Sequence, residues 1–118
     1  MNEEVIIRQY KPGDEKGIIC LLETVFDGWP YKDLQCTPLD HWRWKYEDNP
    51  LKSNAVAVAE SAGKIVGCTH GLFMNVKIGK KLQLAQQGMD LAVDEGFRGR
   101  GIHPKITDLK RKIMRVRI

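Results

Sequence analysis

The stretch LAVDEGFRGRGI, residues 91–102, decides the fold of this chain. It begins with an apolar run, continues through a turn that contains Gly99 and Gly101, and ends at Ile102, where a new apolar periodicity starts. Glycines allow a backbone to run close to a ligand with its N–H groups turned inward, and a helix presents unpaired N–H groups at its positive N-terminus. The stretch therefore predicts a strand, a phosphate-binding loop and a helix.

The helix after the loop is the clearest element by periodicity. Its apolar residues recur at three- and four-residue spacing, which gives one continuous stripe: Ile102, Ile106, Leu109, Ile113 and Val116. Residues 98–118 also hold eight basic side chains and one acid, Asp108, within a chain of net charge +4. This segment predicts an anionic partner, either a phosphorylated small molecule or nucleic acid.

The first half of the chain predicts a strand and two helices. A short apolar run at 5–7 is stopped by Lys11-Pro12-Gly13, and helical spacing of apolar residues follows over 14–26. Thr37 suits the N-cap of a second helix with Pro38 at its first position, and Asp48-Asn49-Pro50 closes it. One face of that helix carries an aromatic stripe, which we expect to be core rather than a substrate cleft: Leu39, Trp42 and Tyr46.

Three antiparallel strands are predicted between the second helix and the loop. Ala62-Gly63-Lys64 and Gly79-Lys80-Lys81 have the composition of hairpin turns. The strand segments around these turns are 55–59, 65–67, 72–78 and 82–93.

Composition limits the class of protein. A chain of 118 residues with 42% hydrophobic and 29% charged residues predicts one globular domain, 1–118. Its acidic N-terminus and the lack of an apolar run of ~20 residues predict a cytoplasmic protein that does not cross a membrane. Cys20, Cys36 and Cys68 are expected to be buried, reduced thiols. The histidines are too scattered to predict a metal site.

The quoted stretch resembles the central motif of the GNAT N-acetyltransferases, in which an apolar strand end leads to an aromatic residue and then Arg/Gln-x-x-Gly-x-Gly/Ala. Residues 60–67 are similar to the hairpin that this family places before the motif, so the resemblance spans nearly the whole chain. It implies a GNAT-like α/β (α+β) fold with a mixed, mainly antiparallel sheet and the order β-α-α-β-β-β-α.

The resemblance also implies acetyl-CoA as cosubstrate, acetyl transfer to a primary amine, and no metal. It places the pantetheine and the acetyl carbonyl against the backbone of 91–93, and the pyrophosphate on the N–H groups of 98–103. The cofactor-binding residues carried over are Leu91, Ala92, Val93, Arg98, Gly99, Arg100, Gly101, Ile102 and His103. His103 departs from the family pattern, which has a small residue at this position.

Acetyl transfer needs a deprotonated amine and donors aimed at the developing oxyanion. Backbone N–H groups near Leu91 suit the oxyanion. Asp90 and His70 are the candidates for the general base by residue type and by their places on neighbouring strands, and each is equally open to a purely structural role.

The resemblance covers only the N-terminal part of the family's fold, which continues with a strand, a helix and a final strand pair. We therefore expect a chain incomplete at its C-terminus, with an open edge on the strand at 82–93 that favours a homo-oligomer. The expected function is N-acetyl transfer to a small-molecule or peptide amine, or acetyl-CoA binding alone. The alternatives are a non-enzymatic basic module that binds nucleic acid and an inactive interaction domain.

Overall fold

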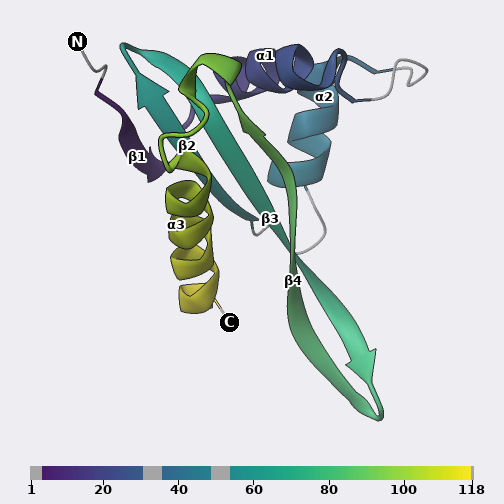
Figure 1. The fold of residues 1–118 in the computed structure, drawn as a ribbon. Coiled ribbons are helices and arrows are strands. Elements are labelled where there is room, and N and C mark those ends of the chain that lie inside the picture. The colour runs from purple at the N-terminus through teal and green to yellow at the C-terminus, as the bar shows by residue number, and fades with distance from the viewer. Residues whose placement is uncertain (1–3, 31–35, 49–53, 118) are drawn as a thin grey trace.

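The computed structural model describes residues 4–30, 36–48 and 54–117. Nine elements follow one another within these ranges (Figure 1): β1 (Ile6–Gln9), α1 (Glu15–Phe26), α2 (Pro38–Trp42), a π-helical turn (Arg43–Glu47), β2 (Asn54–Ser61), β3 (Lys64–Ile78), β4 (Lys81–Val93), a 3-10 turn (Glu95–Phe97) and α3 (Ile102–Arg117). The predicted element order is thus confirmed.

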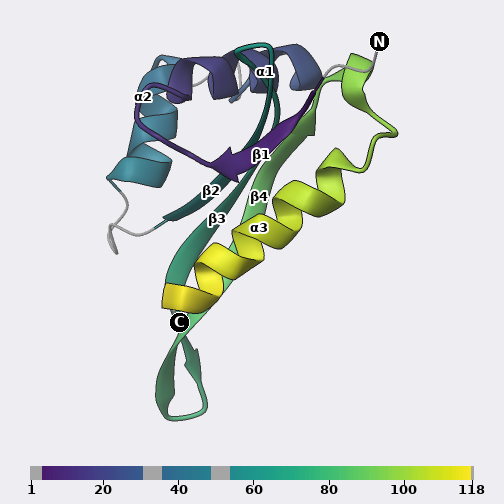
Figure 2. The same cartoon turned by 90° about the vertical axis from the view of Figure 1, so that its left-hand side faces the viewer.

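One sheet with the order β1-β2-β3-β4 forms the middle layer. All three strand pairings among the described residues are antiparallel, as in the pairing of Ile6 with Glu60 and of Ile78 with Lys81. Helices α1 and α2 lie on one side of this sheet and α3 on the other (Figures 1 and 2). β4 pairs with β3 alone, so its other edge is open among the described residues.

β2 divides the core into two layers because its side chains alternate between the faces of the sheet. Val56 and Val58 belong to the cluster under α1 and α2, while Ala57 and Ala59 pack in the cluster beneath α3. The small alanines allow α3 to approach the sheet closely, and Ile106 is fully buried there.

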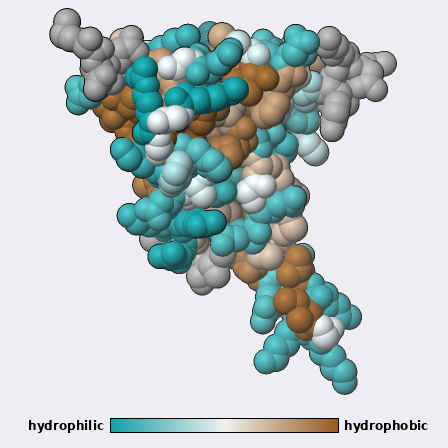
Figure 3. All heavy atoms as spheres, in the orientation of Figure 1, coloured by the Kyte–Doolittle hydropathy of each residue, from teal (hydrophilic) through white to brown (hydrophobic). Residues whose placement is uncertain are grey.

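The end of the β3–β4 hairpin extends beyond the body of the molecule as a two-stranded arm (Figure 1). Its exposed apolar side chains make the brown patch on the arm in Figure 3, whereas the surface over α3 is mostly hydrophilic. The exposed fractions are 59% for Ile78 and 75% for Leu82. β3 is one continuous strand through Gly67 to Leu72, where the sequence predicted two separate segments.

Two local predictions were wrong. The helix predicted from Thr37 is α-helical only as far as Trp42 and continues as a wider π-helical turn, although Thr37 caps it as expected by accepting a hydrogen bond from the Asp40 amide at 3.1 Å. The rings of Trp42 and Tyr46 pack against each other across this change of helix type, and both residues are fully buried.

The prediction of reduced thiols is confirmed for all three cysteines, but the prediction of burial is correct only for Cys68. Cys20 and Cys36 are exposed, and no disulfide involves them. Cys20 lies in α1 between two buried neighbours, Ile19 and Leu21, at a position that the helical period turns toward solvent.

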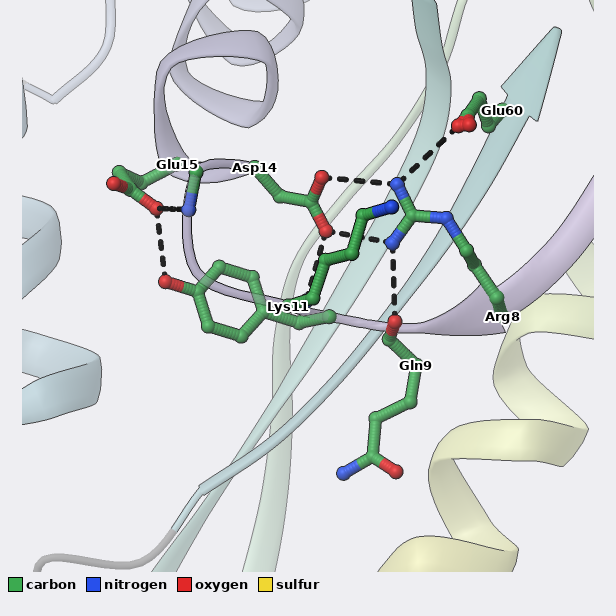
Figure 4. A network of polar contacts seen from close by, with 8 residues as sticks. Arg8, Gln9, Lys11, Asp14, Glu15 and Glu60 are labelled. Carbon is green, nitrogen blue, oxygen red and sulfur yellow. Dashed lines mark hydrogen bonds and ion pairs between the residues drawn. The ribbon is translucent and has the colours of Figure 1, made fainter. Parts of the chain in front are cut away.

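A polar network fastens β1 to the start of α1 and to β2 (Figure 4). The Arg8 guanidinium donates to both carboxylate oxygens of Asp14, at 2.7 and 2.9 Å, and to Glu60 at 3.4 Å. Asp14 also accepts from the Lys11 amide at 2.9 Å. These contacts close the turn between β1 and α1.

Candidate active site

The central feature of the site is a β-bulge in β4. The register between β3 and β4 shifts near Thr69, so that Cys68 faces Ala92 while His70 faces Met89. Asp90 lies inside the bulge with φ of 51°, in the left-handed region that residues other than glycine, asparagine and aspartate rarely adopt. A bulge redirects the strand locally, and at this one it brings a carboxylate into the protein.

Three side chains from the helical side hold the Asp90 carboxylate. It accepts hydrogen bonds from the Lys45 ammonium at 2.8 Å, from the Trp29 indole at 3.1 Å and from the Tyr46 hydroxyl. Burial raises the pKa of Asp90, but the hydrogen bonds from Lys45 and Tyr46 outweigh it and hold the pKa below its usual value. Asp90 is therefore a carboxylate at neutral pH.

His70 holds the backbone of the same bulge. It is fully buried, and its Nδ1 lies 3.0 Å from the carbonyl oxygen of Asp90 while its Nε2 accepts the Trp42 indole N–H at 3.1 Å. These partners fix a neutral ring with the proton on Nδ1. Burial lowers the pKa of His70 to about 4. Both ring nitrogens are occupied, which disfavours a role for His70 in proton transfer to a substrate.

The glycine-rich loop is organised by its own residues. Asp94 accepts from the Gly96 amide at 2.9 Å and starts the 3-10 turn. The Arg98 Nε donates to the Val93 carbonyl at 3.1 Å, and the Arg100 guanidinium lies 4.8 Å from the centroid of the Phe97 ring. The backbone is thus held in shape before any ligand arrives.

The two glycines of the loop have the positive φ angles that favour glycine. Gly99 has φ of 80° and Gly101 has φ of 75°, and open space surrounds the position of a Cβ at each. α3 begins directly after Gly101, so its N-terminal N–H groups adjoin the loop.

Two cavities adjoin each other across the bulge. The loop cavity has a volume of about 450 Å³ and is lined by Val25, Leu91, Ala92, Val93, Phe97, Arg98, Gly99, Gly101, Ile102, His103 and Pro104. The aromatic cavity has a volume of about 710 Å³ and is lined by Phe26, Gly28, Trp29, Pro30, His41, Trp44, Lys45 and Asp90. Consecutive residues of β4 line the two cavities, Asp90 the aromatic cavity and Leu91 the loop cavity.

The structure brings together most of the residues that the sequence singled out. Eight of the nine predicted cofactor-binding residues line the loop cavity, and the ninth, Arg100, stacks on Phe97 at its edge. Asp90 and His70 meet at the bulge, as described above. Their proposed roles in binding and catalysis remain predictions.

Sequence reasoning missed His41, which α2 contributes to the aromatic cavity. Its ring centroid lies 5.2 Å from that of Trp29 and 5.7 Å from that of Trp44, and its ring nitrogens make no hydrogen bond to the described residues. Burial, with a further contribution from the charge of Lys45, lowers the pKa of His41, so the ring is neutral at pH 7. The signal available in the sequence was its place on a capped helix beside Trp42 and Trp44.

Two further findings concern what the described residues do not form. They contain no group of three or more His, Cys, Asp or Glu side chains placed to hold a metal ion. Within the same ranges, no helix is long and apolar enough to cross a membrane.

The strand, the glycine-rich loop and the helix that begins directly after it stand in the order that the sequence resemblance implied. The family model described as an acetyltransferase (GNAT) domain matches residues 6–117. The chain therefore belongs to the GNAT acetyltransferase family. The sequence matches no curated protein.

Solved structures share the fold over nearly the whole chain. Glucosamine-6-phosphate N-acetyltransferase from Arabidopsis thaliana is 19% identical with a TM-score of 0.72, and the match covers 98% of this chain and 77% of that one. An acetyltransferase from Vibrio fischeri is 20% identical with a TM-score of 0.70, covering 95% and 88%.

An aminoglycoside N-acetyltransferase in complex with CoA is 13% identical with a TM-score of 0.70, covering 99% of this chain and 73% of the other. At these identities the three likenesses establish the fold alone.

Proposed function

We propose that the protein is an acetyl-CoA-dependent N-acetyltransferase that transfers an acetyl group to a primary amine. The observation that carries this proposal is the adjacency of the loop cavity and the aromatic cavity across the bulge at Asp90. A thioester held beside Leu91 and an amine held beside Asp90 are within reach of each other.

The loop cavity fits the phosphate end of acetyl-CoA. N–H groups of residues 98–103 and the N-terminus of the sixteen-residue α3 favour a pyrophosphate, with positive charge from Arg98 and Arg100 close by. The apolar lining from Val25 and Leu91 suits the pantetheine arm, which would run along the backbone of 91–93. Open space at Gly99 and Gly101 leaves room for the phosphates against the backbone.

In the reaction, the ammonium first loses one proton to solvent, the amine nitrogen then forms a bond to the acetyl carbon, and the carbon–sulfur bond breaks. The leaving sulfur takes one proton from solvent, to which His41 returns the proton that it accepts from the amine. The amine becomes acidic as it attacks, and the neutral His41 ring accepts its proton. Backbone N–H groups near Leu91 face the oxyanion. Asp90 and His70 are the alternative proton acceptors, but Asp90 is held by three donors and His70 is fully enclosed.

Calorimetric titration with acetyl-CoA tests the binding step, with Gly101→Ala and Gly63→Ala as a matched pair. Both glycines have positive φ and open space at the Cβ position, so both substitutions strain the backbone alike, but Gly63 lies in the β2–β3 turn. We expect Gly101→Ala alone to weaken acetyl-CoA, by about tenfold. Wild-type protein that shows neither heat nor thermal stabilisation with millimolar acetyl-CoA would refute the proposal.

One observation favours a second candidate function, a nucleic-acid-binding module. Lys105, Arg111, Lys112 and Arg115 are all exposed on α3. Nucleic-acid binding through these side chains weakens steeply with salt. Titration of a short duplex at two salt concentrations separates this function from acetyl-CoA binding, which depends on the loop.

We also infer that the open edge of β4 favours self-association, because an unpaired strand edge is a template for another chain. An inactive interaction domain would use the same edge for a different partner. Sedimentation velocity at high protein concentration tests the homo-oligomer, and a strictly monomeric profile would count against it.

A further inference from the structure

The wall of the aromatic cavity has a composition that bears on the kind of acceptor it binds. Its wall consists of a continuous run of rings, in which Trp29 packs edge-on against His41 and His41 packs against Trp44. Trp29 is only 8% exposed and fixes one end of the run, while Trp44 is 65% exposed. Phe26, at the end of α1, also lines the cavity and is 48% exposed. These rings offer a platform to a flat or apolar ligand.

The charges of the cavity cancel within it. Among the described lining residues, the two charged side chains are Lys45 and Asp90, and they pair with each other at 2.8 Å. His41 adds no charge at neutral pH, because its pKa is lowered by burial and by Lys45. A phosphate or carboxylate on the acceptor would therefore find no unpaired cation among the described lining residues, and the cost of desolvating it would go uncompensated there.

An amine, in contrast, fits the cavity both at its nitrogen and at the carbon skeleton beside the nitrogen. Its ammonium form is attracted by the face of the largely exposed Trp44 ring. The carbon skeleton next to the nitrogen covers exposed ring surface when it is apolar. Both effects select the same kind of molecule.

We propose that the aromatic cavity, formed by the rings of Trp29, His41, Trp44 and Phe26 around the Lys45–Asp90 pair, binds the acceptor as a primary amine on an aromatic or apolar carrier without negative charge. Trp44 is the residue that determines this specificity, since it has the largest exposed ring surface in the wall. The inference rests on the proposed function, of which it specifies the acceptor class.

The test compares two amines that share an aminoethyl group, 2-phenylethylamine and O-phosphorylethanolamine, by calorimetry in the presence of CoA. We expect 2-phenylethylamine to bind at least about tenfold more tightly. Trp44→Ala weakens 2-phenylethylamine about tenfold, Trp44→Phe restores most of the affinity, and neither changes the affinity for acetyl-CoA. Leu82→Ala, an equally exposed apolar side chain on the hairpin arm, is the control and leaves both affinities unchanged.

The outcomes distinguish this inference from the proposed function. Equal or tighter binding of O-phosphorylethanolamine, or no effect of Trp44→Ala, overturns the acceptor class even when acetyl-CoA binds as proposed. Binding of 2-phenylethylamine that depends on Trp44 supports the cavity's ligand class, and if acetyl-CoA then fails to bind, the acetyltransferase proposal alone is overturned. Trp44 is largely exposed, so the variants are expected to fold and both results can be obtained.

Discussion

Replacing Asp90 with alanine removes the acceptor around which the bulge in β4 is built. The carboxylate accepts from Lys45, Trp29 and Tyr46, and the residue occupies a left-handed conformation at φ of 51°. Alanine offers no acceptor and tolerates this conformation less well than aspartate does.

The expected loss of stability follows from the hydrogen bonds that residue 90 no longer accepts. Tyr46 is fully buried and Trp29 is 8% exposed, and a buried donor that loses its acceptor costs about 1–3 kcal/mol. Strain at positive φ adds roughly 1 kcal/mol. The total for the two donors and the strain, roughly 3–7 kcal/mol, is a large share of the ~5–15 kcal/mol that stabilises a typical domain. Asp90→Asn keeps one acceptor oxygen and tolerates the left-handed conformation, so it costs roughly 1–2 kcal/mol.

Urea unfolding monitored by circular dichroism measures both variants. The midpoint should fall with an unchanged slope, and a slope of about 1–3 kcal/mol per M converts the loss for alanine into at least about 1 M. The reasoning is refuted if Asp90→Ala costs less than about 1 kcal/mol, or if asparagine costs as much as alanine. Either result would mean that the bulge does not depend on the carboxylate.

Three further predictions follow from the titratable groups. Burial lowers the pKa of His70 to about 4, below the ~6.5 of an unfolded histidine, so the unfolded chain binds more protons between these pH values. The free energy of unfolding should therefore fall by roughly 3 kcal/mol as the pH drops from 6.5 to 4. Urea titrations at several pH values measure this fall, most of which should be absent in His70→Gln. Burial raises the pKa of the Cys68 thiol to about 12, whereas Cys20 and Cys36 are exposed. An aromatic disulfide reagent should therefore react quickly with Cys20 and Cys36, and with Cys68 only after unfolding. Three rapidly reacting thiols in the folded protein would contradict this prediction. If His41 accepts the amine proton, protonation of its ring adds a fall in kcat/KM at a pH below the usual pKa of histidine, since burial lowers the pKa of His41. His41→Gln should lower kcat/KM by about 10²–10⁴ and remove that part of the pH profile.

Local sequence patterns predicted the parts of the fold that local physics controls. The apolar stripe beginning at Ile102 predicted α3, the glycines predicted the loop and the hairpin turns, and Thr37 predicted a capped helix. Family resemblance added the order of the strands. Each of these features depends on residues close together in the chain, so the sequence alone was sufficient.

The bulge and its partners depend on residues far apart in the chain. Whether Asp90 sits in a bulge is decided by the pairing of β4 with β3, and nothing in 82–93 distinguishes a bulged strand from a regular one. Lys45, on the π-helical turn after α2, pairs with Asp90 across 45 positions of the sequence. For the same reason His41 could not be placed beside the bulge before the structure was known.

The pairing of β1 with β2 has a consequence for the order in which the chain folds. β2, β3 and β4 are joined by tight turns, so only short loops have to close when they pair. Ile6, in contrast, pairs with Glu60, and this contact closes a long loop that contains both helices and their connections. β1 should therefore dock after the rate-limiting step, together with the ion pairs of Arg8. Weakening those pairs would then shorten the lifetime of the folded protein while leaving its rate of formation almost unchanged.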